Sequence, residues 1–529
     1  MAFRRLCYDL TLMIYEKAAE LPARRSLAIW AGVAIILVVF SYVFTLLLAA
    51  AFVYLPFLLL SASPNLNTLI VFLAGLIVGA VILWSLLPRK DTFPAPGPRL
   101  DLERHPRLRA ELTTIADALH ESVPLEVYLI PDVNAWVAER GGTMGFGSRR
   151  VMGLGLPLLR ILTISQFRAV LAHEFGHYYS GDTRLWPFVH KTRAAMGRTL
   201  GNLGSDTLSQ ALARINLARL VHYVAVTILV AYWKLFMRIT QAISRLHEYR
   251  ADELASNIAG PQALIDGLST IHGASSVLPV FWRTQMLPAI ESGYRPSLAD
   301  GFAQFIVVPN IASAVADRVK EQLQEATTNP YDTHPPLKDR VAALQFYRTA
   351  VQENESEPAI RLLDSVDGIE SELLQAMVPD RQIAALKPVP WDHIGQDVYV
   401  PKWRVLVHQG ALALGDKTVA RLPELVADLK NIGPRIPDPK GMVLTREQRI
   451  ERAAHLLSTA LAIALCDKGW HFHSSPGQYY FEFEGQRIIP AEVVAQIRSG
   501  DVTKGEWIER CRILGIAEVR LSPAHSAGA

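Results

Sequence analysis

The chain is 529 residues long, half of its residues are hydrophobic, and its mean hydropathy is +0.19. This hydropathy is high for a soluble enzyme and low for a chain that lies mostly in lipid, so it favours a protein that is partly embedded in a membrane. The 53 basic and 50 acidic residues form no basic stripe, and we therefore expect no nucleic-acid partner. Three scattered cysteines exclude a disulfide framework and a cysteine-based metal site, and favour a reducing compartment.

Two uncharged apolar runs near the N-terminus predict a pair of transmembrane helices. They occupy about residues 27–60 and 69–87, and each is long enough for the roughly 20 residues that cross a bilayer. The segment 61–68 contains Ser and Pro and joins them into a hairpin. Core helices of a soluble domain are the alternative. A cleaved signal peptide fits poorly, because the first run is too long and the second follows it at once.

Basic residues flank this hairpin at both ends, whereas its connecting loop has no Lys or Arg. Because cytoplasmic flanks carry the excess of positive charge, we expect both ends of the hairpin in the cytoplasm. The protein is then an integral protein of the bacterial inner membrane, with its catalytic domain on the cytoplasmic face. The basic residues are Arg4, Arg5, Lys17, Arg24 and Arg25 before the hairpin, and Arg89, Lys90 and Arg99 after it.

The strongest chemical signal is the sequence H-E-F-G-H at residues 173–177, inside a segment that predicts a helix. His173 and His177 would lie one turn apart on the same helix face. At that spacing their ring nitrogens can occupy two corners of a zinc tetrahedron, and Glu174 can reach the water at the open corner. The short motif also occurs by chance in unrelated helices, where the two histidines are simply packed or exposed.

A third ligand of suitable chemistry is Glu248, in the sequence H-E-Y-R-A-D-E-L-A. It must come from a separate helix that packs against the first, because 70 residues separate it from His177. Asp252 would share its face, one turn farther on, and could accept a hydrogen bond from the free ring nitrogen of a ligand histidine. The alternative is a solvated acidic face beside Arg245 and Arg250. Two histidines and one glutamate favour one Zn²⁺ per chain.

Four separated motifs together resemble those of the M48 family of metallopeptidases, which includes a bacterial heat-shock membrane protease and the CAAX prenyl proteases. Their order and spacing match the family from about residue 88 to residue 344. The motifs are N-A-W at Asn134, Ala135 and Trp136, H-E-F-G-H at His173–His177, E-Y-R-A-D at Glu248–Asp252, and T-H-P-P-L-K-D-R at Thr333–Arg340.

The resemblance implies roles for individual residues. It makes Glu248 the third zinc ligand, and it places His334 and Arg340 near the site, where they support Asp252 or the oxyanion of the tetrahedral intermediate. From the residues alone, His334 precedes two prolines in a turn, and a surface histidine is the alternative. In the family, an edge strand with the N-A-W sequence lies along the cleft. This implies that residues 134–136 bind an extended substrate backbone.

A third apolar run, residues 220–236, contains His222 and Lys234 and lies between the two parts of the expected metal site. A single membrane crossing there would put His173 and Glu248 on opposite sides of the membrane, where they could not bind the same ion. We therefore expect a buried or membrane-grazing helix, paired with the helix before it. Two crossings would need a second apolar run, and residues 186–204 are too polar for one.

The expected fold is mainly α, of the α+β class, in three parts. Residues 1–90 form the membrane anchor, residues 91–352 a zincin-like helical metallopeptidase domain with a small edge sheet, and residues 353–529 an α+β accessory domain of unknown role. We expect the helix that carries the metal motif to have Ser165 as its N-cap and to end at Gly181.

Local patterns predict further elements. Residues 134–140 and 149–156 indicate two short strands around a Gly-rich turn. In the last part of the chain, residues 362–377 and 445–465 have helical periodicity, and residues 479–489 alternate around Glu484 and Gly485 as a hairpin does.

Two functions follow as hypotheses. The first is a membrane-anchored zinc endopeptidase that hydrolyses protein or peptide substrates in or near the membrane, by means of a metal-activated water. The second is a membrane-tethered binding or regulatory protein whose C-terminal domain recruits partners. The complete set of ligands and base favours the first. A prenylated substrate is disfavoured because only one clear hairpin is visible, whereas the prenyl-protein members of the family have more spans.

Overall fold

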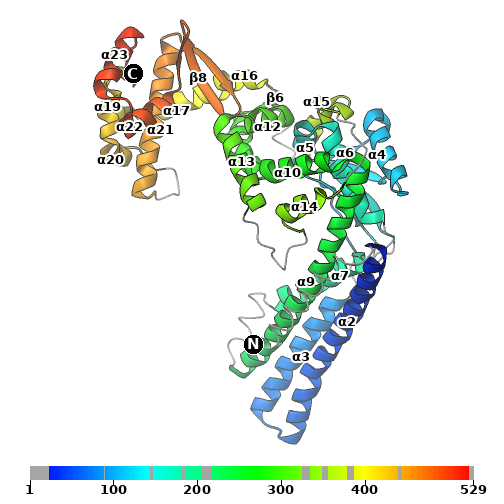
Figure 1. The fold of residues 1–529 in the computed structure, drawn as a ribbon. Coiled ribbons are helices and arrows are strands. Elements are labelled where there is room, and N and C mark those ends of the chain that lie inside the picture. The colour runs from blue at the N-terminus through cyan, green and yellow to red at the C-terminus, as the bar shows by residue number, and fades with distance from the viewer. Residues whose placement is uncertain are drawn as a thin grey trace. The chain divides into compact units, whose positions relative to one another are not determined.

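The fold is mainly helical with a few small sheets, and this confirms the predicted class (Figure 1). The chain forms two compact units, of which the first comprises Met1–Ser275 and Ala316–Met377 and the second Ser276–Val315 and Val378–Ala529. The domain boundaries after residues 90 and 352 stay a prediction. The computed structural model describes residues 23–87, 90–142, 147–179, 186–203, 216–324, 334–347, 355–377, 386–438 and 444–522.

The first unit holds the membrane helices and the predicted metal site. Its strands are β1 (Arg99–Leu100), β2 (Glu126–Ile130), β3 (Ala135–Arg140) and β4 (Arg149–Gly155). Its helices are α2 (Ala23–Ala62), α3 (Leu66–Leu86), η1 (Leu102–Arg104), α4 (Pro106–Ala118), α5 (Leu156–Ile161), α6 (Ile164–Tyr179), α7 (Trp186–Leu203), α9 (Asn216–Ala259), α14 (Leu337–Leu344), η4 (Ala359–Leu362) and α15 (Val366–Met377). Helices α10 (Pro261–Phe281) and α13 (Pro309–Gln324) contribute to both units.

Helices α2 and α3 form the predicted apolar hairpin. Both have the length and hydropathy of membrane spans, and apolar side chains point outward from them, with Leu47 66% exposed. Glycines let the two helices approach closely, since a Cβ on Gly75 would lie 2.1 Å from the carbonyl oxygen of Phe52. Small residues at helix contacts are typical of membrane bundles, where backbone proximity stabilises the pair.

The apolar run at 220–236 forms part of the first half of α9, which is a third helix long and apolar enough to cross a membrane among the described residues. Of the two expected alternatives, a fully buried helix does not fit, because Leu220 is 60% and Tyr223 66% exposed, whereas contact of this apolar face with the membrane stays a prediction. The expected pairing with the preceding helix is confirmed, since α7 packs against α9 and both pack against α3. Helix α7 turns Thr192, Arg193 and other polar side chains inward, which explains how so polar a helix packs there.

The polypeptide leaves the metal motif through α7 and returns through α9, whose second half packs against α6 (Figure 1). This arrangement brings His177 and Glu248 together, as a shared ion requires.

A four-stranded sheet covers α6 in the order β1-β2-β4-β3. Strands β2 and β4 are parallel, and β3 pairs with β4 as an antiparallel hairpin at the edge of the sheet. The two predicted strands around a Gly-rich turn are thereby confirmed. Helix α6 packs against β3 with one face and against α9 with another.

The start of α6 differs from the prediction. Thr163, and not Ser165, caps the helix: Thr163 Oγ1 accepts a hydrogen bond from the backbone N–H of Gln166 at 3.2 Å, and Gln166 Oε1 accepts one from the N–H of Thr163 at 3.1 Å. Such a reciprocal pair satisfies two donors that a helix start would otherwise leave open. Ser165 instead accepts from the N–H of Glu355 at 2.7 Å. The predicted end at Gly181 lies outside the described residues.

The second unit packs short helices and a small sheet around α21. Its strands are β5 (Tyr294–Arg295), β6 (Lys387–Pro388), β7 (His471–Ser475), β8 (Gln478–Phe483) and β9 (Gln486–Ile488). Its helices are η3 (Trp282–Met286), α11 (Leu287–Glu291), α12 (Leu298–Ile306), α16 (Trp391–Ile394), η5 (Gly395–Tyr399), α17 (Val400–Gln409), α18 (Ala411–Leu414), η6 (Val419–Arg421), α19 (Leu422–Ala427), α20 (Leu429–Ile432), η7 (Gly433–Arg435), α21 (Arg446–Asp467), α22 (Pro490–Ser499) and α23 (Lys504–Ile513).

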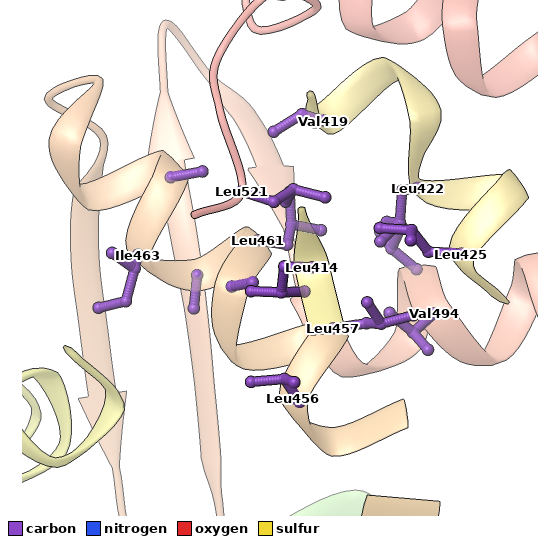
Figure 2. Packing of buried hydrophobic residues seen from close by; sticks show 14 of the residues in the cluster. Leu414, Val419, Leu422, Leu425, Leu456, Leu457, Leu461, Ile463, Val494 and Leu521 are labelled. Carbon is purple, nitrogen blue, oxygen red and sulfur yellow. The ribbon is translucent and has the colours of Figure 1, made fainter. Parts of the chain in front are cut away.

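The core of the second unit lies along α21, where Leu456, Leu457 and Leu461 face leucines and valines of the surrounding helices (Figure 2). The predicted helix at 445–465 and the hairpin at 479–489 are confirmed. Glu484 and Gly485 both have a positive φ, of 49° and 76°, as a tight two-residue hairpin turn requires.

Candidate metal centre

Helices α6 and α9 approach closely at Gly176 and Ala251. A Cβ on Gly176 would lie only 3.1 Å from the Cα of Ala251, so the glycine of H-E-F-G-H is the residue that permits this spacing. Glu248 lies three residues before Ala251 and therefore on nearly the same face of α9. The contact brings it opposite His173 and His177.

The three predicted ligands converge. Single ligand atoms of His173, His177 and Glu248 all lie within 4.8 Å of one another. Nε2 of His173 is 3.4 Å from Oε2 of Glu248, and Nε2 of His177 is 3.6 Å from Oε1. The side chain of His177 is 27% exposed, whereas those of the other two are buried. The group is therefore open on one side, as a site that admits water and substrate must be.

The donor set fits a divalent cation. Oε2 of Glu248 is buried and accepts no well-oriented hydrogen bond from the described residues, although Nδ1 of His334 lies 3.0 Å away. A buried carboxylate oxygen without a donor is costly, and a cation beside it removes that cost. Two imidazole nitrogens and one carboxylate are the ligand types of zinc sites with an open position.

The electrostatics of the histidines agree with such a site. Burial lowers the pKa of His177 to about 3, which keeps its ring neutral and able to bind a metal. Burial and Arg340 act to lower the pKa of His173, but its close approach to the Asp252 and Glu248 carboxylates outweighs them and raises it to about 9. The two carboxylates thus favour positive charge at this point, and a metal ion supplies it without a proton.

The ion pair between Asp252 and Arg340 orients the ring of His173. Its Nδ1 lies 2.9 Å from Oδ1 of Asp252, which directs Nε2 toward Glu248. Arg340 donates from Nη2 to Oδ1 of Asp252 at 2.6 Å and from Nε to Oδ2 at 2.9 Å. Burial alone would raise the pKa of Asp252. The positive charge of Arg340 and the hydrogen bond with His173 have the larger effect, and the net result is a pKa lowered to about 2. The carboxylate therefore stays ionised across the physiological range.

Glu174 lies on α6 beside the ligand histidines, on the face that meets β3. Burial raises the pKa of its carboxyl above the ordinary value, and a hydrogen bond from the backbone N–H of Val137 acts in the opposite direction. A carboxylate with a raised pKa next to a metal site is suited to accept a proton from water near neutral pH.

Comparison with known proteins agrees with this geometry. Residues 103–348 match the model of Peptidase family M48. This segment of the chain is therefore similar to the family that the four motifs resemble. The matched segment contains the three convergent ligands, Glu174, Asp252, His334 and Arg340, and it ends before residue 353.

Curated relatives of this M48 segment are named as proteases. A Protease HtpX homolog of Aeropyrum pernix is 30% identical over 206 residues, which are 35% of this chain and 59% of the relative. A homolog of Arthrobacter sp. is 28% identical over 36% of this chain and 55% of the relative, and Protease HtpX of Acinetobacter baylyi is 26% identical over 45% and 73%. The chain thus spans little more than half the length of the first two. No solved structure matches it.

The N-A-W sequence lies at the start of the edge strand of the M48 segment. Asn134 is exposed, and Ala135 is buried. The ring of Trp136 packs across β4, where a Cβ on Gly153 would lie 2.4 Å from it. The tryptophan therefore anchors the edge strand to the sheet, and substrate binding by residues 134–136 stays a prediction.

His334 and Arg340 both reach the centre but contact different residues. Nδ1 of His334 is 3.0 Å from Oε2 of Glu248, whereas Arg340 binds mainly Asp252, at 2.6 Å, and has its Nη1 3.8 Å from the same Glu248 oxygen. The position of His334 could not be derived from spacing, because no regular element connects it to the other motifs. Tyr178 was not predicted from the sequence; its hydroxyl donates to the carbonyl oxygen of Val137 at 2.9 Å. Its spacing of four residues from Glu174 is the signal that could have found it.

A Gly176→Val substitution tests whether the contact between α6 and α9 sets the metal geometry. The added side chain meets the backbone of Ala251 and must push α9 away, which moves Glu248 from the two histidines. We expect weaker zinc binding in a chelator competition and a loss of about 1–3 kcal/mol in the free energy of unfolding.

Gly368→Ala is the matched control, since a Cβ at this helical glycine of the same unit would meet nothing within 4 Å. It should leave both quantities close to the wild type. Wild-type zinc affinity in Gly176→Val would show that the helix contact does not determine the site.

Proposed function

We propose that this protein is a membrane-anchored zinc metalloendopeptidase. The observation that carries the proposal is the convergence of His173, His177 and Glu248 around one point, with Glu174 beside them, in a segment of an established peptidase family. Those three side chains hold the metal. Asp252 holds His173 in the tautomer that presents Nε2, and Arg340 keeps Asp252 ionised.

The reaction is peptide-bond hydrolysis. When bound, zinc supplies a Lewis acid that lowers the pKa of a water molecule and polarises the scissile carbonyl. Glu174 accepts the proton of the attacking water and later delivers it to the leaving amine. The N–H of Val137 stabilises the ionised form of this carboxyl, which must be present to accept the proton. His334 lies beside Glu248, at a place from which it can donate a hydrogen bond to the developing oxyanion.

The membrane helices determine where such an enzyme works. Helices α2 and α3, and the first half of α9, are suited to a bilayer, and the distribution of positive charge favours a metal centre on the cytoplasmic face of a bacterial inner membrane. Substrates are then proteins in or near that membrane. Residues 353–529 provide an accessory domain. An extended substrate would run along the edge strand near residues 134–136.

The test is a measurement of zinc content together with cleavage of unfolded casein by the detergent-purified protein. We expect about one zinc per chain, as the ligand count requires, and cleavage that stops with a chelator and returns with added zinc. A protein that binds zinc but cleaves neither casein nor other unfolded proteins would contradict the proposal. It would favour a membrane-tethered binding protein.

A further inference from the structure

Strand β3 is held against α6 by two side chains that bind the same strand residue. The hydroxyl of Tyr178 donates to the carbonyl oxygen of Val137 at 2.9 Å, and the N–H of Val137 donates to the carboxylate of Glu174. Glu174 and Tyr178 are four residues apart on α6 and so project from one face, one turn apart. This face of the helix therefore engages both backbone groups of Val137.

The register of the sheet leaves these backbone groups available. The N–H of Gly155 donates to the carbonyl oxygen of Asn134 at 2.9 Å, which makes these two residues a hydrogen-bonded pair. Such pairs alternate along an antiparallel ladder, so Val137 and its partner Met152 form a non-hydrogen-bonded pair. The N–H and carbonyl of Val137 point away from β4. Because β3 is the edge strand, they can bind α6 without the loss of a ladder bond.

The ring of Tyr178 is itself fixed. The guanidinium carbon of Arg150 lies 4.3 Å from the ring centroid, a distance at which a cation is attracted to the aromatic face. Arg150 is held in turn by Glu121, since its Nη1 lies 2.9 Å from Oε2. The phenol is therefore restrained on its face by Arg150 and at its hydroxyl by Val137.

We propose that Tyr178 is a positioning residue for Glu174, an inference that rests on the proposed peptidase function. By holding the carbonyl oxygen of Val137, Tyr178 fixes the distance between β3 and the face of α6 that carries Glu174. The Glu174 carboxylate, which the N–H of Val137 contacts, is thereby kept in place. His173 and His177 lie on a neighbouring face of α6, and Tyr178 forms no bond with either of them among the described contacts. Tyr178 thus acts on the base and not on the metal.

The test compares Tyr178→Phe with the wild type in full-length, detergent-purified protein. A quenched fluorescent peptide derived from a casein cleavage site gives kcat and KM, and chelator competition gives zinc affinity. Loss of one hydrogen bond that orients the base should lower kcat roughly three- to tenfold, while KM and zinc affinity stay within about twofold. A structural defect would change all three and lower the unfolding temperature as well.

Tyr128→Phe is the matched control. Its hydroxyl donates to Oε2 of Glu126 at 2.6 Å on β2, a strand of the same sheet that does not neighbour β3. Its kinetics should equal those of the wild type. Val137→Pro removes the N–H that binds Glu174, at an edge position where proline breaks no ladder bond. Tyr178→Phe should lower kcat no further in that background, because both substitutions act through the same contact.

Two results would overturn the inference while the proposed function stands. One is wild-type cleavage of the peptide with an unchanged kcat in Tyr178→Phe. The other is a proportional loss of zinc affinity and kcat in that variant, which would make Tyr178 a support of the metal ligands. A zinc-loaded wild type that cleaves no peptide would overturn the proposed function and this inference together.

Discussion

Glu174→Gln should keep its zinc and lose turnover. Glutamine has nearly the same shape as glutamate, and its side-chain oxygen can still accept the hydrogen bond from Val137, but it cannot take a proton from water. Removal of a general base typically costs a factor of roughly 10² to 10⁴, and we expect a fall in kcat of that size with casein or a peptide. Zinc content should match the wild type, because Glu174 is not among the three convergent ligands.

Stability provides a second readout for the same variant. Burial raises the pKa of Glu174, which means that the fold favours its neutral form over the ionised form present at neutral pH. The Glu174→Gln variant, with a neutral side chain at this position, should therefore unfold at the same temperature as the wild type or at a higher one.

Glu103→Gln, an exposed glutamate in an ion pair with Arg109 on the same unit, serves as the control and should retain full activity. Full turnover in Glu174→Gln would disprove the assignment of the base. Loss of zinc would show that Glu174 belongs to the ligand set.

The residues of the metal centre could be predicted because the chemistry imposes a helical spacing. His173 and His177 share a face of α6, and Glu248 and Asp252 share a face of α9, so two short patterns specify four side chains. What sequence spacing does not contain is the angle and distance at which the two helices meet. The close approach depends on Gly176, which has no side chain to keep Ala251 away. The motif H-E-F-G-H contains this glycine but does not show which residue of another helix packs against it.

Other features depend on contacts between distant parts of the chain. Ser165 has the chemistry of a helix cap, but Thr163 takes that role since Ser165 binds the backbone of Glu355. The polarity of residues 186–204 argued against a second apolar membrane span, and in the structure polar side chains of α7 face neighbouring helices, including α3 of the apolar hairpin. Hydropathy averages a helix over all of its faces and so cannot distinguish an inward polar face from a solvated one.

Asp252→Ala should damage both the fold and the metal site. Arg340 is 4% exposed and makes two hydrogen bonds to Asp252. Removal of the carboxylate therefore takes away its closest counter-ion and both of these hydrogen bonds, and leaves Glu248 at 3.8 Å as its remaining ion-pair partner. Breaking a buried pair in this way typically costs about 3–5 kcal/mol, and we expect a loss of that size in the free energy of unfolding. Loss of the acceptor for Nδ1 of His173 should weaken zinc binding roughly 10- to 100-fold.

The two effects can be separated by a second substitution. In Asp252→Ala/Arg340→Met the buried charge is gone as well, so much of the stability should return, whereas zinc affinity should stay low since His173 still lacks its acceptor. Glu357→Ala, which removes an exposed partner of Arg107 at 2.8 Å, should change neither quantity appreciably. Equal recovery of stability and zinc affinity in the double variant would mean that Asp252 acts on the metal only through the fold. A double variant that is stable and binds zinc weakly would show that this buried carboxylate, although it touches no substrate, orients His173 for the metal.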